Sequence, residues 1–445
     1  MADSSMVSGV LPLSTCPQSD GNADLDLDVN ITGSEDSADD VQCADTDISW
    51  PPWDCLPPEL LAKIFCHLQD ADKESVESTC QAWCEACQNP ALWHTQMFAF
   101  TGDNCLQTVH QACRTIQRKG YLLRNMTLKI GIPSLPQAWI ISQSVQQLLE
   151  FITRHPASRY IQRLTINRLD FFKHWRFFTL SKRHLADVDL TQCGLSADNG
   201  MRILRALSNS PSRYTMKQLF LHDFFHSRYQ ATLGSRFGLL LTSFPALRHL
   251  SVDARHVDSS FLLSLVNRRI LRRLTLHFES FPPREVITEK VWIQVREIDP
   301  DLDVTFVFGG RIPFEHAKNV LVPSVPLTEF EVNWPRAYRQ SFATHQQLAA
   351  LLNRVALLYS AILERFRVRS NIRATEETEL ALLRVANDCR RLVEFKVNLK
   401  LSESVLTEIR SKLLGRSQHI RVRLLKKKKL QCLPSQFRHR SRGSH

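Results

Sequence analysis

The chain has 445 residues, a net charge of +11 and 43% hydrophobic residues, which is enough apolar material for several folded units or a repeat array. No apolar run reaches the roughly 18 to 20 residues of a membrane-spanning helix. The N-terminus also lacks the basic and apolar regions of a secretory signal. We therefore expect a soluble protein of the cytoplasm, the nucleus or both, without a membrane partner.

Both ends of the chain are polar and strongly biased in charge. Met1 to Asp54 contains 12 Asp or Glu residues and no Lys or Arg, whereas Arg416 to His445 contains ten Lys or Arg residues and no acid. Such segments cannot bury enough apolar surface to fold alone. We predict an acidic disordered tail over residues 1–50 and a basic disordered tail over residues 426–445.

The first folded unit is predicted to consist of short helices. Pro57 and Pro58 suit the first turn of a helix, and Glu59 suits its positive end. The stripe that follows is Leu60, Leu61, Ile64, Phe65 and Leu68. A second helix is expected from Asp70 or Asp72 through Val76, Cys80, Trp83 and Cys87, ending at Asn89-Pro90. Leu92 and Trp93 fall on a third short element.

The segment Leu56 to Met97 resembles an F-box. The matching residues are Leu56-Pro57-Pro58-Glu59-Leu60-Leu61, Ile64-Phe65, Leu68, Asp72, Cys80, Trp83 and Leu92-Trp93. The resemblance implies an F-box over residues 51–100 that binds a Skp-type adaptor, which in turn links to a cullin–RING ligase core. By position, the adaptor surface comprises Leu56, Pro57, Leu60, Ile64, Phe65, Trp83 and Trp93. Lys73 stands where the family usually has Leu.

A metal site in the same segment is an alternative. Cys80, Cys84 and Cys87 have the spacing of a radical-SAM iron–sulfur site, and Cys84, Cys87 and His94 could bind zinc. Iron–sulfur ligands need a loop on which the thiolates converge, whereas these cysteines fall on a predicted helix. We therefore expect structural thiols, no metal and no cofactor.

The rest of the chain repeats the pattern Leu-x-x-Leu-x-Leu. Nine copies end at residues 128, 166, 190, 221, 252, 276, 332, 368 and 397, and partial copies end at 306 and 424. A short strand followed by a helix, repeated every 24 to 38 residues, is typical of leucine-rich repeats. We predict an α/β solenoid of degenerate repeats over residues 101–425, with a parallel sheet on its concave face. A generic α/β sheet is the alternative. Together with the F-box, these repeats resemble the F-box/leucine-rich-repeat family.

The strand pattern predicts a concave binding face, because alternate side chains of a strand point away from the core. Its C-terminal end gathers Arg367, Arg369, Lys396 and Arg423. Arginine forks suit carboxylate or phosphate groups, so an acidic or phosphorylated protein target could bind there. A solvated charged face is the alternative. Aromatic clusters at Asp170–Phe178 and Asp223–Phe225 are either partner anchors or core.

No phosphate loop, nucleophile elbow, paired zinc spacing or kinase signature is present, so we expect no catalytic residues. The resemblance implies a non-catalytic substrate adaptor of a Skp–cullin–F-box ubiquitin ligase. One alternative is a scaffold that binds the Skp-type adaptor without a cullin. Another is a nucleic-acid-binding protein that uses the basic C-terminal region, although no aromatic residues interleave that run.

Overall fold

The computed structural model describes residues 53–68, 70–101, 104–131, 135–169, 184–226, 233–278, 286–309, 314–334, 342–415 and 420–424. The chain divides into two units, Met1–Trp53 and Asp54–His445, and apart from Trp53 the described residues belong to the second. The predicted tails at 1–50 and 426–445 lie outside the described residues, as does the aromatic segment at 170–178.

The described strands form one parallel sheet in which the strand order follows the chain. The strands are β1 (Thr95–Phe100), β2 (Asn125–Ile130), β3 (Arg163–Ile166), β4 (Asp187–Asp189), β5 (Gln218–Phe220), β6 (His249–Asp253), β7 (Arg273–Phe278), β8 (Asp303–Gly309), β9 (Leu327–Trp334), β10 (Arg365–Arg373), β11 (Glu394–Lys400) and β12 (Arg421–Leu424). This arrangement confirms the predicted repeat solenoid, since every strand pairs with the strands just before and after it in the sequence.

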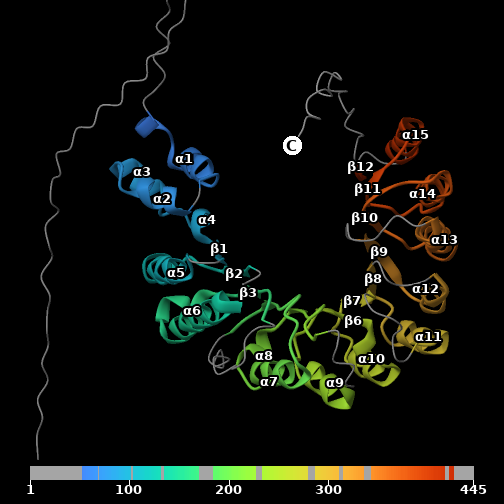
Figure 1. The fold of residues 1–445 in the computed structure, drawn as a ribbon, viewed down its shortest axis with the longest axis horizontal. Coiled ribbons are helices and arrows are strands. Elements are labelled where there is room, and N and C mark those ends of the chain that lie inside the picture. The colour runs from blue at the N-terminus through green and yellow to red at the C-terminus, as the bar shows by residue number, and fades with distance from the viewer. Residues whose placement is uncertain are drawn as a thin grey trace, which may run out of the picture. The chain divides into compact units, whose positions relative to one another are not determined.

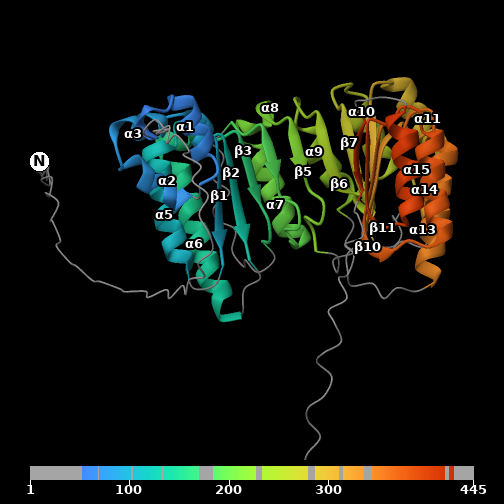
Figure 2. The ribbon, with the colours of Figure 1, turned by 90° about the horizontal axis from the view of Figure 1, so that it is seen from above.

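Helices occupy the intervals between strands and lie along one side of the sheet (Figures 1 and 2). The F-box helices are α1 (Pro58–Phe65), α2 (Asp70–Glu77), α3 (Gln81–Ala86) and α4 (Pro90–Trp93), preceded by η1 (Trp53–Cys55). The repeat helices are α5 (Cys105–Lys119), α6 (Leu135–Arg154), α7 (Ala197–Ser208), α8 (Ser212–Thr215), α9 (Gly234–Thr242), α10 (Ser259–Val266), α11 (Glu289–Ile298), α12 (Phe314–Val320), α13 (Phe342–Tyr359), α14 (Glu376–Asp388) and α15 (Glu403–Leu414), with short turns η3 (Pro156–Tyr160) and η5 (Ala254–His256).

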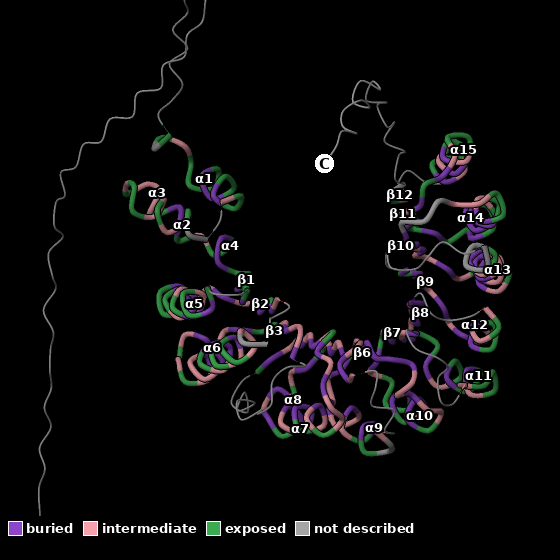
Figure 3. The backbone as a smooth tube through the Cα atoms, viewed as in Figure 1, coloured by how far each residue is buried: buried purple, intermediate pink, exposed green. Residues whose placement is uncertain are grey.

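One continuous apolar core lies between the strands and the helices (Figure 3). The last two apolar positions of the repeats from β2 to β11 point into it, as Leu274 and Leu276 of β7 do, and both of these are at most 1% exposed. Apolar residues from neighbouring strands therefore stack on one another, as Phe330, Phe366 and Phe395 do at ring-centroid distances of 6.1 and 5.2 Å. No single repeat could bury these rings alone.

Polar side chains also connect neighbouring turns of the solenoid. The backbone amide of Ile130 donates to Asn167 Oδ1 at 2.8 Å, the Cys193 thiol lies 3.3 Å from the carbonyl of Ile166, and the amide of Asp223 donates to Asp253 Oδ1 at 3.1 Å. These contacts form an incomplete version of the asparagine or cysteine ladder of regular repeats.

One expectation about the helices near the F-box was wrong. The second helix does not run through to Cys87, because the chain is extended at Cys80 (φ −153°, ψ 170°) and divides the segment into α2 and α3. The Ser78 and Thr79 hydroxyls donate to the carbonyl of Ser75 and compete with helix continuation. Residues 95–100 form strand β1, which the sequence pattern did not predict and which pairs with β2.

The aromatic cluster at Asp223–Phe225 belongs to the core. Phe224 and Phe225 are 0% and 2% exposed, and their rings meet edge to face at 4.8 Å. Phe225 also contacts the ring of Phe237 on α9 at 5.7 Å. These side chains therefore fill space between α7 and α9 and do not serve as surface anchors.

Candidate functional site

The F-box helices have a small core of their own. It contains Leu61, Phe65, Ala86, Cys87, Leu92 and Trp93, with Leu56 and Trp83 among the half-buried residues around it. Phe65 and Trp83 meet edge to face at 5.3 Å. Phe65 and Trp93 are 3% and 2% exposed. Of the residues predicted for the adaptor surface, these two therefore lie beneath it and support it.

Helix α1 presents apolar side chains to solvent on the face opposite this core. Leu60 and Ile64 are 45% and 40% exposed, although they lie one turn apart on a helix whose Leu61 and Phe65 are buried. Pro57 is exposed at the start of the helix and Leu56 is half-buried. An exposed apolar pair at i and i+4 forms a continuous strip on which a protein partner can pack. We call Leu60 and Ile64 the α1 strip.

Trp93 is the centre of a junction between the F-box and the first repeat helix. The Lys119 ammonium of α5 donates to Glu77 Oε1 at 2.7 Å and to Gln88 Oε1 at 3.1 Å, and it lies 5.5 Å from the centroid of the Trp93 ring. Lys73 of α2 lies 5.9 Å from the same ring. Both lysines are less than 10% exposed. Lys73, which stands where the F-box family usually has Leu, thus makes a cation–π contact with the indole ring of Trp93.

The cysteines of the F-box segment do not converge on a common point in the way that metal ligands require. Cys87 is buried, and its thiol lies 4.0 Å from the carbonyl of Lys73. Burial raises the pKa of Cys87 to about 11, which disfavours the thiolate that binds metals. In the part of the chain that the structure describes, no group of three His, Cys, Asp or Glu side chains is placed to hold a metal ion.

The basic residues predicted on the concave face do lie on adjacent strands. Arg367 of β10 is in register with Lys396 of β11, which is in register with Arg423 of β12. Arg369 lies two residues further along β10 and therefore on the same face of the sheet. We call this the inner face, because the helices cover the other side (Figure 1). The side chain of Arg423 lies outside the described residues.

Three carboxylates are buried among these basic residues, and two of them, Glu329 and Glu394, were not predicted on this face. Arg367 contacts Glu329, Glu331 and Glu394, which are 6%, 9% and 6% exposed. Arg365 donates to Glu329 at 2.9 Å, and Lys396 lies 2.8 Å from Glu394. The basic residues of β10 and β11 therefore alternate with carboxylates in a network of charges and do not form an open row of cations.

Within this network, the pKa values of the Glu331 and Glu394 carboxyl groups are shifted in opposite directions. Burial raises the pKa of the Glu331 carboxyl above its usual range, against the effect of Arg369 and Arg367. Burial acts in the same direction on Glu394, but hydrogen bonds from Arg367 and Lys396 outweigh it and hold the pKa of that carboxyl at about 2. Glu394 consequently stays ionised and fixes the guanidinium of Arg367.

Histidines gather on the inner face of the central strands. The rings of His222 and His277 stack at 4.2 Å, His277 Nε2 lies 2.9 Å from the Ser251 hydroxyl, and His249 Nε2 lies 3.2 Å from the Thr275 hydroxyl. Burial, followed by the charge of Arg273, lowers the pKa of His249 to about 4. Burial also lowers the pKa of His277 well below its usual range, so His249 and His277 are neutral hydrogen-bonding groups near pH 7.

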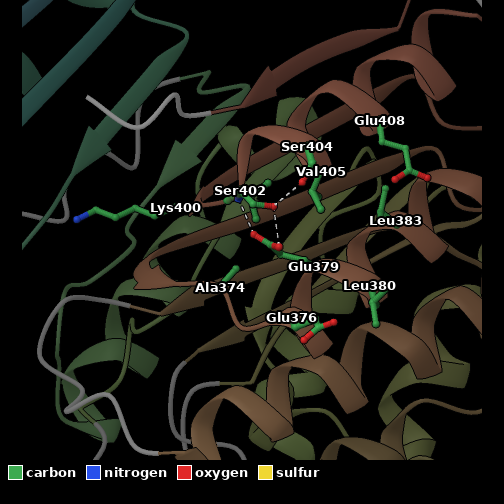
Figure 4. Close-up of a pocket in the computed structure, with 11 residues that line it drawn as sticks. Ala374, Glu376, Glu379, Leu380, Leu383, Lys400, Ser402, Ser404, Val405 and Glu408 are labelled. Atoms are coloured by element: carbon green, nitrogen blue, oxygen red, sulfur yellow. Dashed lines mark hydrogen bonds between the residues drawn. The ribbon is translucent and has the colours of Figure 1, made fainter. Parts of the chain in front are cut away.

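A shallow hollow of about 540 Å³ lies between α14 and α15 (Figure 4). Its polar lining holds the two helices together, since Glu379 accepts hydrogen bonds from the amide and hydroxyl of Ser402 at 2.6 and 2.8 Å. Leu380, Leu383 and Val405 form much of the apolar lining, and the lining contains no histidine or cysteine. Over the described ranges, no helix combines the length and apolar character needed to cross a membrane.

A small helical domain with an exposed apolar strip, joined to a leucine-rich-repeat solenoid, defines the F-box/leucine-rich-repeat class, and the comparisons with known proteins agree. Residues 53–99 match the F-box-like family model. The chain is also similar to human F-box/LRR-repeat protein 8, with 24% identity over 377 residues that cover 81% of this chain and 92% of that protein. The chain therefore combines a segment similar to the F-box-like family with a leucine-rich-repeat solenoid.

The matches among solved structures include one enzyme. It is the NAD-complexed D-isomer specific 2-hydroxyacid dehydrogenase from Lactobacillus delbrueckii ssp. bulgaricus. It is 10% identical, covers 73% of this chain and 99% of its own, and superimposes with a TM-score of 0.16. A value this low carries no argument about fold or function.

Proposed function

We propose that this chain is the substrate-recognition subunit of a Skp–cullin–F-box ubiquitin ligase and performs no catalysis itself. The F-box helices bind the Skp-type adaptor, which connects them to the cullin–RING core, and the inner face of the repeat sheet binds the target protein. The observation that carries the proposal is the α1 strip, whose exposed Leu60 and Ile64 lie within the segment that matches the F-box-like model.

The experiment replaces both residues of the α1 strip with glutamate and follows co-purification of the Skp-type adaptor and a cullin from cells. We expect both partners to be lost, since two charges would then face an apolar surface on the adaptor. The matched control is Leu357→Glu on α13, because Leu357 is 74% exposed and lies on a repeat helix. Circular dichroism checks that each variant keeps the wild-type fold.

Retention of the adaptor by the double variant would contradict the proposal. Recovery of the adaptor with the wild-type chain, but never a cullin, would instead support the non-ligase scaffold. Loss of the adaptor in Leu357→Glu as well would show that the assay reports general damage and not the α1 strip.

A further inference from the structure

The charge network on β9–β11 divides its cations into two kinds. Arg365 and Arg367 are held by buried carboxylates, and side-chain exposures of 24% and 22% leave them little surface for a ligand. The Arg369 side chain is 59% exposed. It forms an ion pair with Glu331, whose Oε1 lies 3.3 Å from the Arg369 Nε. Arg365 and Arg367 are therefore structural, whereas a partner can reach the side chain of Arg369.

Arg369 lies between two amide side chains. It is in register with Asn333 on β9 and with Asn398 on β11, so the three residues form one row across adjacent strands about 4.8 Å apart. Asn333 is exposed and Asn398 is half-buried. The side-chain oxygen of Asn398 is buried and has no hydrogen-bond partner among the described residues. We call Asn333, Arg369 and Asn398 the amide–arginine row.

The chemistry of this row suits an acidic peptide segment. With Nε directed to Glu331, the two terminal nitrogens of Arg369 form a fork that matches the two oxygens of a carboxylate. The flanking amides can donate to and accept from peptide groups on either side of that carboxylate. Four cations contact three carboxylates in the charge network, so its net positive charge favours an anion. The cations are Arg365, Arg367, Arg369 and Lys396, and the carboxylates are Glu329, Glu331 and Glu394.

We infer that the amide–arginine row binds an Asp or Glu side chain of an extended acidic segment in the target protein. This inference rests on the proposed function, because it names the chemistry of the target that the inner face recognises. The charge balance favours a carboxylate over a phosphate. Four cations and three carboxylates leave one net positive charge, which a carboxylate neutralises and which the charge near −2 of a phosphate exceeds.

The test selects short peptides from a random displayed library on the full chain and then measures the affinities of synthetic versions. Three versions of each selected peptide are compared: the original, one with its acids replaced by amides, and one with phosphoserine in place of the acid. We expect acidic peptides to be enriched and the amide version to bind roughly 10- to 100-fold more weakly, as for loss of a hydrogen-bonded charge. Arg369→Gln should cause a similar loss, and Arg369→Lys a smaller one.

The control is Arg384→Gln, which removes the same charge from helix α14, where Arg384 is exposed and bonded to Asn353 at 3.1 Å. It should leave the affinity unchanged. Absence of acidic enrichment, tighter binding of the phosphoserine version, or equal loss in Arg384→Gln would each overturn the inference. Adaptor co-purification is measured separately, so that a chain that recruits adaptor and cullin but shows none of these effects fails the inference alone.

Discussion

Gly200 on α7 shows how closely the repeats are packed at the level of single atoms. A Cβ at this position would lie 2.3 Å from Phe225 Cε1 and 3.0 Å from Phe224 Cε1. Both rings are buried, so neither can move aside without disturbing α9. The absence of a side chain at Gly200 therefore lets the turn at Asp223–Phe225 pack against α7.

Gly200→Ala should consequently destabilise the protein by about 1 to 3 kcal/mol, as overpacking does, in spite of the roughly 1 kcal/mol by which alanine favours a helix. The free energy of unfolding from urea denaturation measures the effect. Phe225→Leu in the same background should recover part of the loss, because it removes the ring that the new methyl group meets. A Gly200→Ala variant as stable as the wild type would contradict this account.

At the residue scale, the sequence predicted the cations of the inner face but not their environment. The positions predicted on this face were the residue between the last two apolar positions of each strand and the residue after them. Glu329 and Glu394 lie two residues before Glu331 and Lys396, and side-chain alternation places them on the same face. They could have been found by extending the alternation back along each strand. The burial of Glu329 and Glu394 could not have been predicted in this way, since it depends on the long side chains of adjacent strands.

At the level of secondary-structure elements, the junction between the F-box and α5 depends on a nearly buried ion pair. The side chains of Lys119 and Glu77 are 7% and 11% exposed, and their charged atoms are 2.7 Å apart. Lys119→Met keeps the aliphatic stem but leaves the Glu77 carboxylate without its main partner. Loss of one member of a buried pair costs about 3 to 5 kcal/mol, so amide hydrogen exchange in α2 and α5 should become faster.

The double variant Lys119→Met with Glu77→Gln should be more stable than Lys119→Met alone, because no unpaired charge is left. Arg154→Met provides the control, since Arg154 and Glu150 form an exposed pair at 3.9 Å, with side chains 82% and 41% exposed. Exposed pairs contribute about 0 to 1 kcal/mol. Equal effects of Lys119→Met and Arg154→Met on hydrogen exchange would contradict the claim that the Lys119–Glu77 pair stabilises the junction.

The central strands should make stability depend on pH through their histidines. The pKa of His249 is about 4 in the folded protein and 6.5 in the unfolded chain, so between these values the unfolded chain binds more protons. Stability is therefore fully present above pH 6.5 and is lost as the pH falls toward 4, by about 2 kcal/mol at pH 5 for this residue. Asp253 acts in the opposite direction, because burial raises its pKa to about 6.

His249→Gln isolates the contribution of one histidine. Its free energy of unfolding should fall less steeply than that of the wild type between pH 7 and pH 5, since the variant has no imidazole to protonate on unfolding. His94→Gln, at an exposed position, serves as the control and should retain the wild-type slope. Identical slopes for His249→Gln and the wild type would show that His249 does not contribute.

For the whole molecule, the repeat pattern was predictable because it is set by local spacing, whereas the beginning of the array was not. All eleven copies identified in the sequence correspond to strands β2–β12. Strand β1 (Thr-Gln-Met-Phe-Ala-Phe) lacks the leucine pattern, and its Phe98 and Phe100 are buried through packing on later repeats. The break between α2 and α3 was missed for a related reason, since helical periodicity continues across Cys80 although the backbone does not.

The dependence of each repeat on its neighbours leads to a prediction about truncation. Ending the chain after Asn267 removes β7 to β12, leaves the edge of β6 unpaired and uncovers the apolar side of α10 that contacts α11. Stacked repeats that lose a neighbour expose a face of the core. We therefore expect residues 53–267 to aggregate, as measured by light scattering and sedimentation velocity.

The matched control is a fragment of residues 53–424, which keeps every described strand and helix and should remain monodisperse. The two fragments share their N-terminus and differ only in how many repeats follow α10. Aggregation of the shorter fragment alone would show that repeats beyond Asn267 stabilise those before it. A monodisperse 53–267 fragment that melts cooperatively would instead establish a domain boundary at Asn267, and the apolar core that runs through the whole array would then consist of two independently stable halves.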